Sequence, residues 1–296
     1  MGHDHLIKMD YSAAVRKVLV ITLVLNAGVA VAKIFYGYVT NSIAMTSDGF
    51  HSLFDGVSNV IGLIGIWIAS NPPDEKHPYG HKKYETLFTI IIAVMIFATC
   101  FQILRKVYLS FFYDHRTIVT GTSFLVMLIT MGINIFVMFY ESKKGRQLCS
   151  EFLIADAMHT KSDIFASVSV IASLLFTKFG FRHADTIVGF IITFFIARIG
   201  SKILKDASNI LVDTVCIDNA AVRAVVNGVS GVKGCHEIRS RGTVNEVYLD
   251  LHVLVKNSMP LEEAHGIADN IEEEIKKTFP AVVDIVVHVE PETMKH

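Results

Sequence analysis

The chain has 296 residues, of which 52% are hydrophobic, and its mean hydropathy is +0.47. This is too apolar for an ordinary soluble protein of its size, and we therefore expect a membrane protein. A formal net charge of -1 gives no support for nucleic-acid binding. The four cysteines form no Cys-x-x-Cys pair, so neither a disulfide framework nor a thiolate zinc site is predicted.

Six apolar stretches are each long enough, at about 20 residues, to span a bilayer as a helix. They cover residues 18–37, 43–69, 85–110, 118–140, 150–177 and 184–205. The polar residues 1–11 lack the apolar core and cleavage site of a signal peptide, so we expect the first stretch to be retained. Lys and Arg are more frequent before the first stretch and after the second, fourth and sixth than at the opposite ends. The positive-inside rule therefore places both termini in the cytoplasm.

The second and fifth stretches contain the same motif, Asp-x-x-His-x-x-x-Asp. Its members are Asp48, His51 and Asp55 in the first copy and Asp156, His159 and Asp163 in the second. Spacings of three and four residues place the three side chains of each copy on one helix face, because a turn takes about 3.6 residues. An ionisable residue within a membrane costs about 2.5–3.5 kcal/mol on insertion scales and is therefore read as functional.

We predict that His51, Asp55, His159 and Asp163 form one four-ligand site for a divalent cation, since Zn²⁺ takes imidazole and carboxylate ligands in a tetrahedral shell. The alternative is a hydrogen-bonded cluster that joins helices, although such clusters usually use a single Asn, Ser or Thr. Asp48 and Asp156 could orient the histidines, line an entrance or cap their helices, and the spacing does not decide between these roles. Because the ligands titrate, protons compete with the ion, and we hypothesise an antiport cycle.

After about residue 207 the apolar runs give way to mixed charged and apolar residues, which predicts a soluble domain over 208–296 after a transmembrane transport domain over 1–207. Its expected elements are a helix over 219–229, strands over 235–240 and 246–256, a helix over 261–279 and a strand over 281–289. This α-β-β-α-β order predicts a small antiparallel-type α+β domain with its helices on one sheet face. About 85 residues is small enough to gain from dimerisation.

Six helices, the repeated His-x-x-x-Asp, a histidine-containing loop after the second helix and this tail together resemble the cation diffusion facilitator family of zinc and iron exporters, with its metallochaperone-like cytoplasmic domain. The resemblance implies a homodimeric exporter of Zn²⁺, or of a similar ion, from the cytoplasm against protons. It assigns the transport ligands to His51, Asp55, His159 and Asp163. A His at both first-ligand positions is similar to the zinc-preferring members, and imidazole suits zinc. Compact connections favour a prokaryotic inner membrane.

The resemblance also implies zinc sites outside the membrane that regulate transport. A loop site comprises Asp74, His77 and His81, and the cytoplasmic domain sites comprise His236, His252, His265, His288 and Glu290. Glu290 stands where relatives carry Asp, which puts its ligand geometry in doubt. The alternatives are a solvated loop and surface histidines on strands. For the N-terminal His3 and His5, a polar chain end is favoured over a role in feeding metal to the entrance.

Two other functions compete with transport by antiport. A membrane metalloenzyme needs an open metal position and a general base, whereas four ligands close this site and no His-Glu-x-x-His occurs. A passive channel holds ions loosely at several sites, which a closed His and Asp shell contradicts. The residues do not fix the cargo among Zn²⁺, Cd²⁺, Fe²⁺, Co²⁺ and Ni²⁺, so export of another of these ions by the same mechanism stays an alternative.

Overall fold

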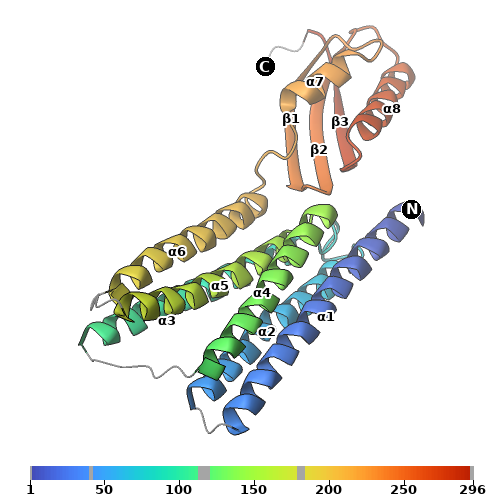
Figure 1. Cartoon of the computed structure of the whole chain (residues 1–296). Helices are drawn as coiled ribbons and strands as arrows, with labels where there is room; N and C mark the ends of the chain where they lie inside the picture. The colour runs from blue at the N-terminus through green and yellow to red at the C-terminus, as the bar shows by residue number, and fades with distance from the viewer. Residues whose placement is uncertain (1, 40–42, 113–120, 179–183, 294–296) are drawn as a thin grey trace. The chain divides into compact units, whose positions relative to one another are not determined.

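The computed structural model describes residues 2–39, 43–112, 121–178 and 184–293. For some helix residues only the backbone is described, among them His3, His5, Asp48, His51 and Asp55. The chain divides into two compact units, Met1–Ala207 and Ser208–His296, each of which is described by itself (Figure 1).

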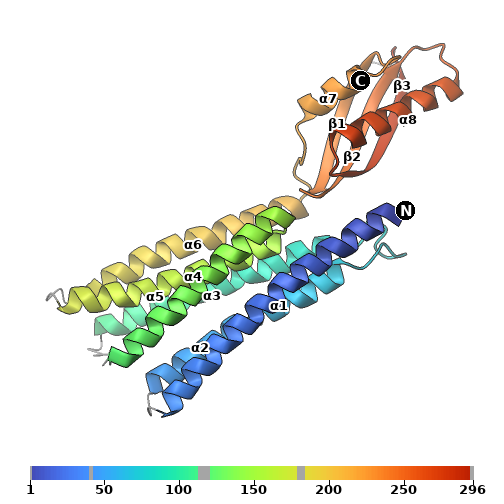
Figure 2. The same ribbon diagram turned by 45° about the vertical axis from the view of Figure 1, so that its right-hand side comes forward.

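The first unit consists, in its described residues, of six helices that run alongside one another (Figures 1 and 2). Their bounds are α1 (Gly2–Val39), α2 (Ile43–Ala69), α3 (Lys83–Phe112), α4 (Gly121–Leu148), α5 (Glu151–Lys178) and α6 (Ala184–Leu211). Helix α1 packs against α2 and α4, and α3 packs against α2 and α5. The two helices that carry the repeated motif, α2 and α5, thus each have several helical neighbours.

Within the described residues, four helices contain a stretch that is long and apolar enough to cross a membrane. These stretches are Tyr11–Val39, Lys83–Leu109, Phe124–Leu148 and Ile187–Leu211. The other two long helices are α2, with a shorter apolar part at Gly56–Ala69, and α5; both carry the ionisable residues of the motif. Large apolar side chains such as Trp67, Phe101 and Phe139 are exposed on the unit, as expected of a surface that faces lipid.

An apolar core joins five of these helices. Leu19, Ile66, Ile92, Phe152 and Ile196 belong to α1, α2, α3, α5 and α6 respectively, and all are fully buried. Phe152 lies against Gly62 of α2, where an added Cβ atom would clash with the Phe152 ring. The close approach of α2 and α5 at this point therefore requires a residue without a side chain.

Replacing Gly62 with alanine should destabilise the first unit, because Phe152 must move or the helices must separate, and overpacking of this kind costs about 1–3 kcal/mol. The control is G132A on α4, where an added Cβ meets nothing within 4 Å. We expect a lower apparent melting temperature of the purified full-length protein for G62A than for G132A. Equal melting temperatures would show that the approach at Gly62 is not a packing constraint.

The second unit contains α7 (Asn219–Asn227), β1 (Gly234–Thr243), β2 (Glu246–Val255), α8 (Leu261–Thr278) and β3 (Val282–Pro291). The α-β-β-α-β order is therefore as predicted. The sheet order is β1-β2-β3, with β1 and β2 antiparallel but β2 and β3 parallel. The prediction of an antiparallel-type sheet is wrong for β3, because α8 is a crossover that returns the chain to start β3 in the direction of β2.

Strand β2 alternates between a buried and a partly exposed face. Val247, Leu249, Leu251 and Val253 are buried in one core with residues of α7 and α8, so both helices lie on this face of the sheet, as predicted. A strand places successive side chains on opposite faces, so His252 belongs to the other face. One face of the sheet therefore packs against α7 and α8, and the other face carries His252.

Candidate metal sites

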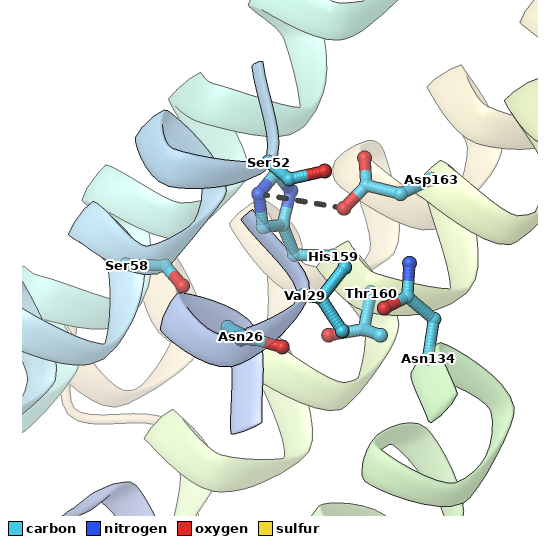
Figure 3. Close-up of a pocket in the computed structure, with 8 residues that line it drawn as sticks. All are labelled: Asn26, Val29, Ser52, Ser58, Asn134, His159, Thr160 and Asp163. Atoms are coloured by element: carbon cyan, nitrogen blue, oxygen red, sulfur yellow. Dashed lines mark ion pairs between the residues drawn. The ribbon is translucent and has the colours of Figure 1, made fainter. Parts of the chain in front are cut away.

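The transport motif is described on α5, where His159 and Asp163 lie one turn apart. His159 Nε2 is 3.9 Å from Asp163 Oδ2, and the two side chains are only 4% and 13% exposed (Figure 3). Both point into a small pocket in the first unit. The side chains of His51 and Asp55, which sequence analysis predicted as the other two ligands, lie outside the described residues.

Four helices line this pocket. The lining residues are Asn26 and Val29 of α1, Ser52 and Ser58 of α2, Asn134 of α4, and His159, Thr160 and Asp163 of α5. The pocket volume is about 20 Å³. A water molecule needs at least about 10–15 Å³, so the space is comparable with one water molecule or one dehydrated ion. Sequence analysis missed the Asn and Ser residues, because these residue types are ordinary at contacts between membrane helices.

A buried lysine lies beside the pocket. Lys33 of α1 is 7% exposed, and its Nζ donates a hydrogen bond of 2.9 Å to Ser52 Oγ. This contact joins α1 to a residue of α2 that lines the pocket. Lys33 carried the signal used for the motif, an ionisable residue in an apolar stretch, but it was overlooked.

Asp156 is fully inside the first unit, at 1% exposure. Its Oδ2 accepts a hydrogen bond of 2.8 Å from Asn59 Nδ2, and Asn59 Oδ1 accepts one of 3.0 Å from Asn26. Helix α5 begins at Glu151, so Asp156 lies in its second turn and the interpretation as a helix cap is wrong. Asp48 also follows the start of its helix, by five residues.

The loop between α2 and α3 brings Asp74, His77 and His81 together, with one ligand atom from each within 4.8 Å of the others. Asp74 Oδ1 accepts hydrogen bonds from the backbone N–H groups of His77 and Lys76, and chiefly the first of these lowers the pKa of Asp74. The carboxylate is therefore ionised and available to a cation at neutral pH.

His81 is held in an orientation suited to metal binding. Its Nδ1 lies 3.2 Å from the Pro72 carbonyl oxygen, which can only accept, so we assign the proton of the neutral ring to Nδ1. The lone pair of Nε2 then points toward Asp74 Oδ2, 3.5 Å away. A ring fixed through its second nitrogen is typical of metal ligands, and one carboxylate with two imidazoles fits Zn²⁺ with a fourth position open.

In the second unit, three histidines form a row across the sheet. His236 on β1 pairs with His252 on β2, and His252 pairs with His288 on β3. Their ring centroids are 5.4 Å and 4.6 Å apart. Because residues paired across strands share a face, strand register alone brings these three imidazoles together.

Glu290 lies two residues after His288 and lies among the three histidines. Its side chain is 4% exposed, with Oε1 2.8 Å from His252 Nδ1 and 3.5 Å from His288 Nδ1, and Oε2 3.4 Å from His236 Nε2. The glutamate that raised doubt in the sequence therefore reaches all three rings. A buried carboxylate surrounded by imidazole nitrogens fits a divalent cation such as Zn²⁺.

Two further residues depart from the sequence prediction. His265 lies on α8, 76% exposed, and pairs with Asp269 at 3.8 Å, so the structure of one chain does not bring it to the histidine row. Glu237 was missed: a β-bulge after His236, with Glu237 at φ 47°, brings its Oε2 to 3.8 Å from His252 Nε2. Bulges occur beside functional sites, but their position cannot be read from residue spacing.

Replacing Glu290 with glutamine should weaken metal binding by the histidine row, because it removes the anionic ligand and keeps the side-chain volume. Equilibrium zinc titration of the full-length protein should show at least a tenfold weaker site in E290Q, the loss typical of damage to a metal's supporting groups. The exposed E292Q on the same segment is the control and should bind as wild type does. Identical titrations of E290Q and wild type would exclude Glu290 as a ligand.

Both units of the chain match domains of a known protein family. The transmembrane domain of cation efflux proteins matches residues 19–212, and the cytoplasmic domain of cation efflux proteins matches residues 216–292. The chain therefore belongs to the cation efflux family, also called cation diffusion facilitators. Members of this family are membrane transporters for divalent metal cations, and the second unit is a cytoplasmic domain.

Relatives from three domains of life span most of the chain. An uncharacterized transporter, MJ0449, of Methanocaldococcus jannaschii is 34% identical over 86% of this chain and 90% of its own length. The manganese efflux system protein MneP of Bacillus subtilis is 28% identical over 93% of this chain and 96% of its own. Metal tolerance protein C1 of Arabidopsis thaliana is 27% identical over 93% of this chain and 62% of its own.

Proposed function

We propose that this protein exports Zn²⁺ from the cytoplasm in exchange for protons, with His51, Asp55, His159 and Asp163 as the ligands of the transported ion. The observation that carries the proposal is the buried pair of His159 and Asp163 in a pocket sized for a dehydrated ion. An imidazole and a carboxylate inside an apolar unit are costly unless they bind something.

The backbone of α2 supports the contribution of its copy of the motif. Each residue of a helix is turned by about 100° from the one before. Ser52 and Ser58 both line the pocket, and their positions around the helix axis of α2 differ by about 120°. The positions of His51 and Asp55 around the same axis fall between these two serines. The two copies of the motif thus belong to helix faces that meet at one pocket.

The nature of the ligands favours zinc over manganese. Two imidazoles and two carboxylates suit Zn²⁺, whereas Mn²⁺ prefers sites built from oxygen. The printed name of the Bacillus relative is a manganese efflux protein, but at 28% identity its cargo need not be the same. Export of Mn²⁺, Fe²⁺, Cd²⁺ or Co²⁺ by the same site is the alternative.

Protons are the natural counter-ion because the proposed ligands titrate. Histidine must be neutral to bind a metal, so binding releases protons and acid releases the metal. We further propose that both termini are cytoplasmic, since six crossings return the chain to its starting side and the second unit matches a cytoplasmic domain. The small tail, matched to that domain, supports a homodimer in which the loop and tail sites bind regulatory zinc.

Transport by purified protein in vesicles tests the proposal. Vesicles loaded with a zinc dye and a pH dye should show saturable Zn²⁺ uptake, with Zn²⁺ preferred to Mn²⁺ and accompanied by proton flux in the opposite direction. D55A and D163A should each lower the Zn²⁺ rate by at least about 100-fold, equivalent to about 2.7 kcal/mol. E273A, on the exposed face of α8, is the control and should transport as wild type does.

The outcomes separate the parts of the proposal. Full Zn²⁺ flux in D55A or D163A would remove the assigned site. Zn²⁺ flux without proton counterflow would leave the site standing and remove the exchange, and faster Mn²⁺ flux would change the cargo alone.

A further inference from the structure

A second carboxylate lies deep in the first unit, outside the proposed ligand set. Glu141 of α4 is completely buried, and within the described residues neither of its carboxylate oxygens has a hydrogen bond of good geometry, although Thr22, Asn59 and Asp156 lie near enough to interact with it. Burying an ionised carboxylate without a partner costs many kcal/mol, and such a group takes up a proton instead. The repeated motif does not include Glu141, and neither the proposed transport site nor the metal sites outside the membrane use it.

The side chains that face Glu141 come from three other helices. They are Thr22 of α1, Asn59 of α2 and Asp156 of α5, and His159 lies one turn beyond Asp156. A hydroxyl, an amide and a second carboxyl therefore surround the Glu141 carboxyl, and none of the three is a cation. On α4 itself the next charged residues are Lys143 and Lys144, and Glu141 hydrogen-bonds to neither.

The orientation of Asn59 decides between a proton and a metal at this place. Its Nδ2 donates to Asp156 Oδ2 at 2.8 Å and to Thr22 Oγ1 at 3.2 Å, while its Oδ1 accepts from Asn26. The Asn59 side chain thus turns its N–H groups toward Asp156. Its carbonyl oxygen Oδ1, the one atom of the amide that could bind a metal, faces Asn26 instead. Two neighbouring carboxylates without a cation are stable only when at least one is neutral.

We propose that Glu141 is a proton-binding site of the membrane unit, separate from the ligands of the transported ion. The protonated Glu141 carboxyl donates its O–H toward the Asp156 carboxylate, and on release the proton leaves Glu141 ionised. Asp156, held by Asn59, lies between this proton and His159. The site thereby places a titrating group of α4 next to Asp156, which itself lies one helical turn from His159 of the proposed transport site.

Infrared spectroscopy of the full-length protein in lipid tests the proposal directly, because a protonated carboxylic acid has a C=O stretch that a carboxylate lacks. Wild type and the surface control E273Q should both show this band at neutral pH, and E141Q should lose one such component. D156N keeps Glu141 and should shift the frequency of the band, since the acid then faces an amide instead of a carboxylate.

Each other outcome overturns the assignment. An E141Q spectrum identical to that of wild type would place the proton elsewhere, and absence of the band in wild type would show that Glu141 is ionised. Loss of the band on addition of Mn²⁺ to the D163A variant would make the cluster a cation site instead. If E141Q does not fold, the shift expected for D156N still decides the question.

A role for this proton in transport rests on the proposed exchange of Zn²⁺ for protons, and a separate measurement addresses it. E141Q should still bind Zn²⁺ but should exchange about one proton fewer for each ion, measured as proton release during zinc titration at several pH values. If E141Q releases as many protons per Zn²⁺ as wild type does, the proton on Glu141 takes no part in the exchange. The infrared result does not depend on the antiport, so failure of one proposal is distinguishable from failure of the other.

Discussion

Ionisable groups inside an apolar helical unit need polar protein groups as partners, because neither lipid nor packed apolar side chains can replace water. This constraint organises the membrane unit. His159 and Asp163 face a pocket lined by amides and hydroxyls, Asp156 is held by Asn59, and Lys33 donates to Ser52. These contacts join α1, α2 and α5 in addition to the apolar core that those helices share. The polar groups around the pocket therefore also position the helices.

The cytoplasmic domain satisfies a buried carboxylate in a different way. Glu290 lies beneath three histidines that strand register places side by side, while the helices occupy the opposite face of the sheet. In both units regular secondary structure arranges the acid and the imidazoles: His159 and Asp163 lie one turn apart on a helix, and Glu290 lies two residues along β3 from a histidine that is paired across the strands. A protein that binds a metal reversibly benefits from such positioning, since its ligands are oriented before the ion arrives.

Sequence alone predicted those features that follow from periodicity. The i, i+4 spacing put His159 and Asp163 on one face, and alternation along β2 identified its buried residues, because both repeats are local. The sequence prediction missed the parallel pairing of β2 and β3, although the helix α8 between them is the kind of crossover that parallel neighbours require. The joining of Glu290 to three histidines, the bulge at Glu237 and the burial of Glu141 depend on tertiary packing, which residue spacing does not encode.

The central claim is that both copies of the motif ligate one ion, and X-ray absorption at the zinc edge tests it most directly. The protein would carry H77A, H81A, H236A and H252A, which leave no imidazole in the loop site and only His288 in the histidine row, so that the transport site alone keeps a pair of imidazoles. The account predicts a four-coordinate shell of two imidazole nitrogens and two carboxylate oxygens at about 2.0–2.2 Å. A shell with fewer than two imidazoles, or one unchanged by D163A, would contradict it.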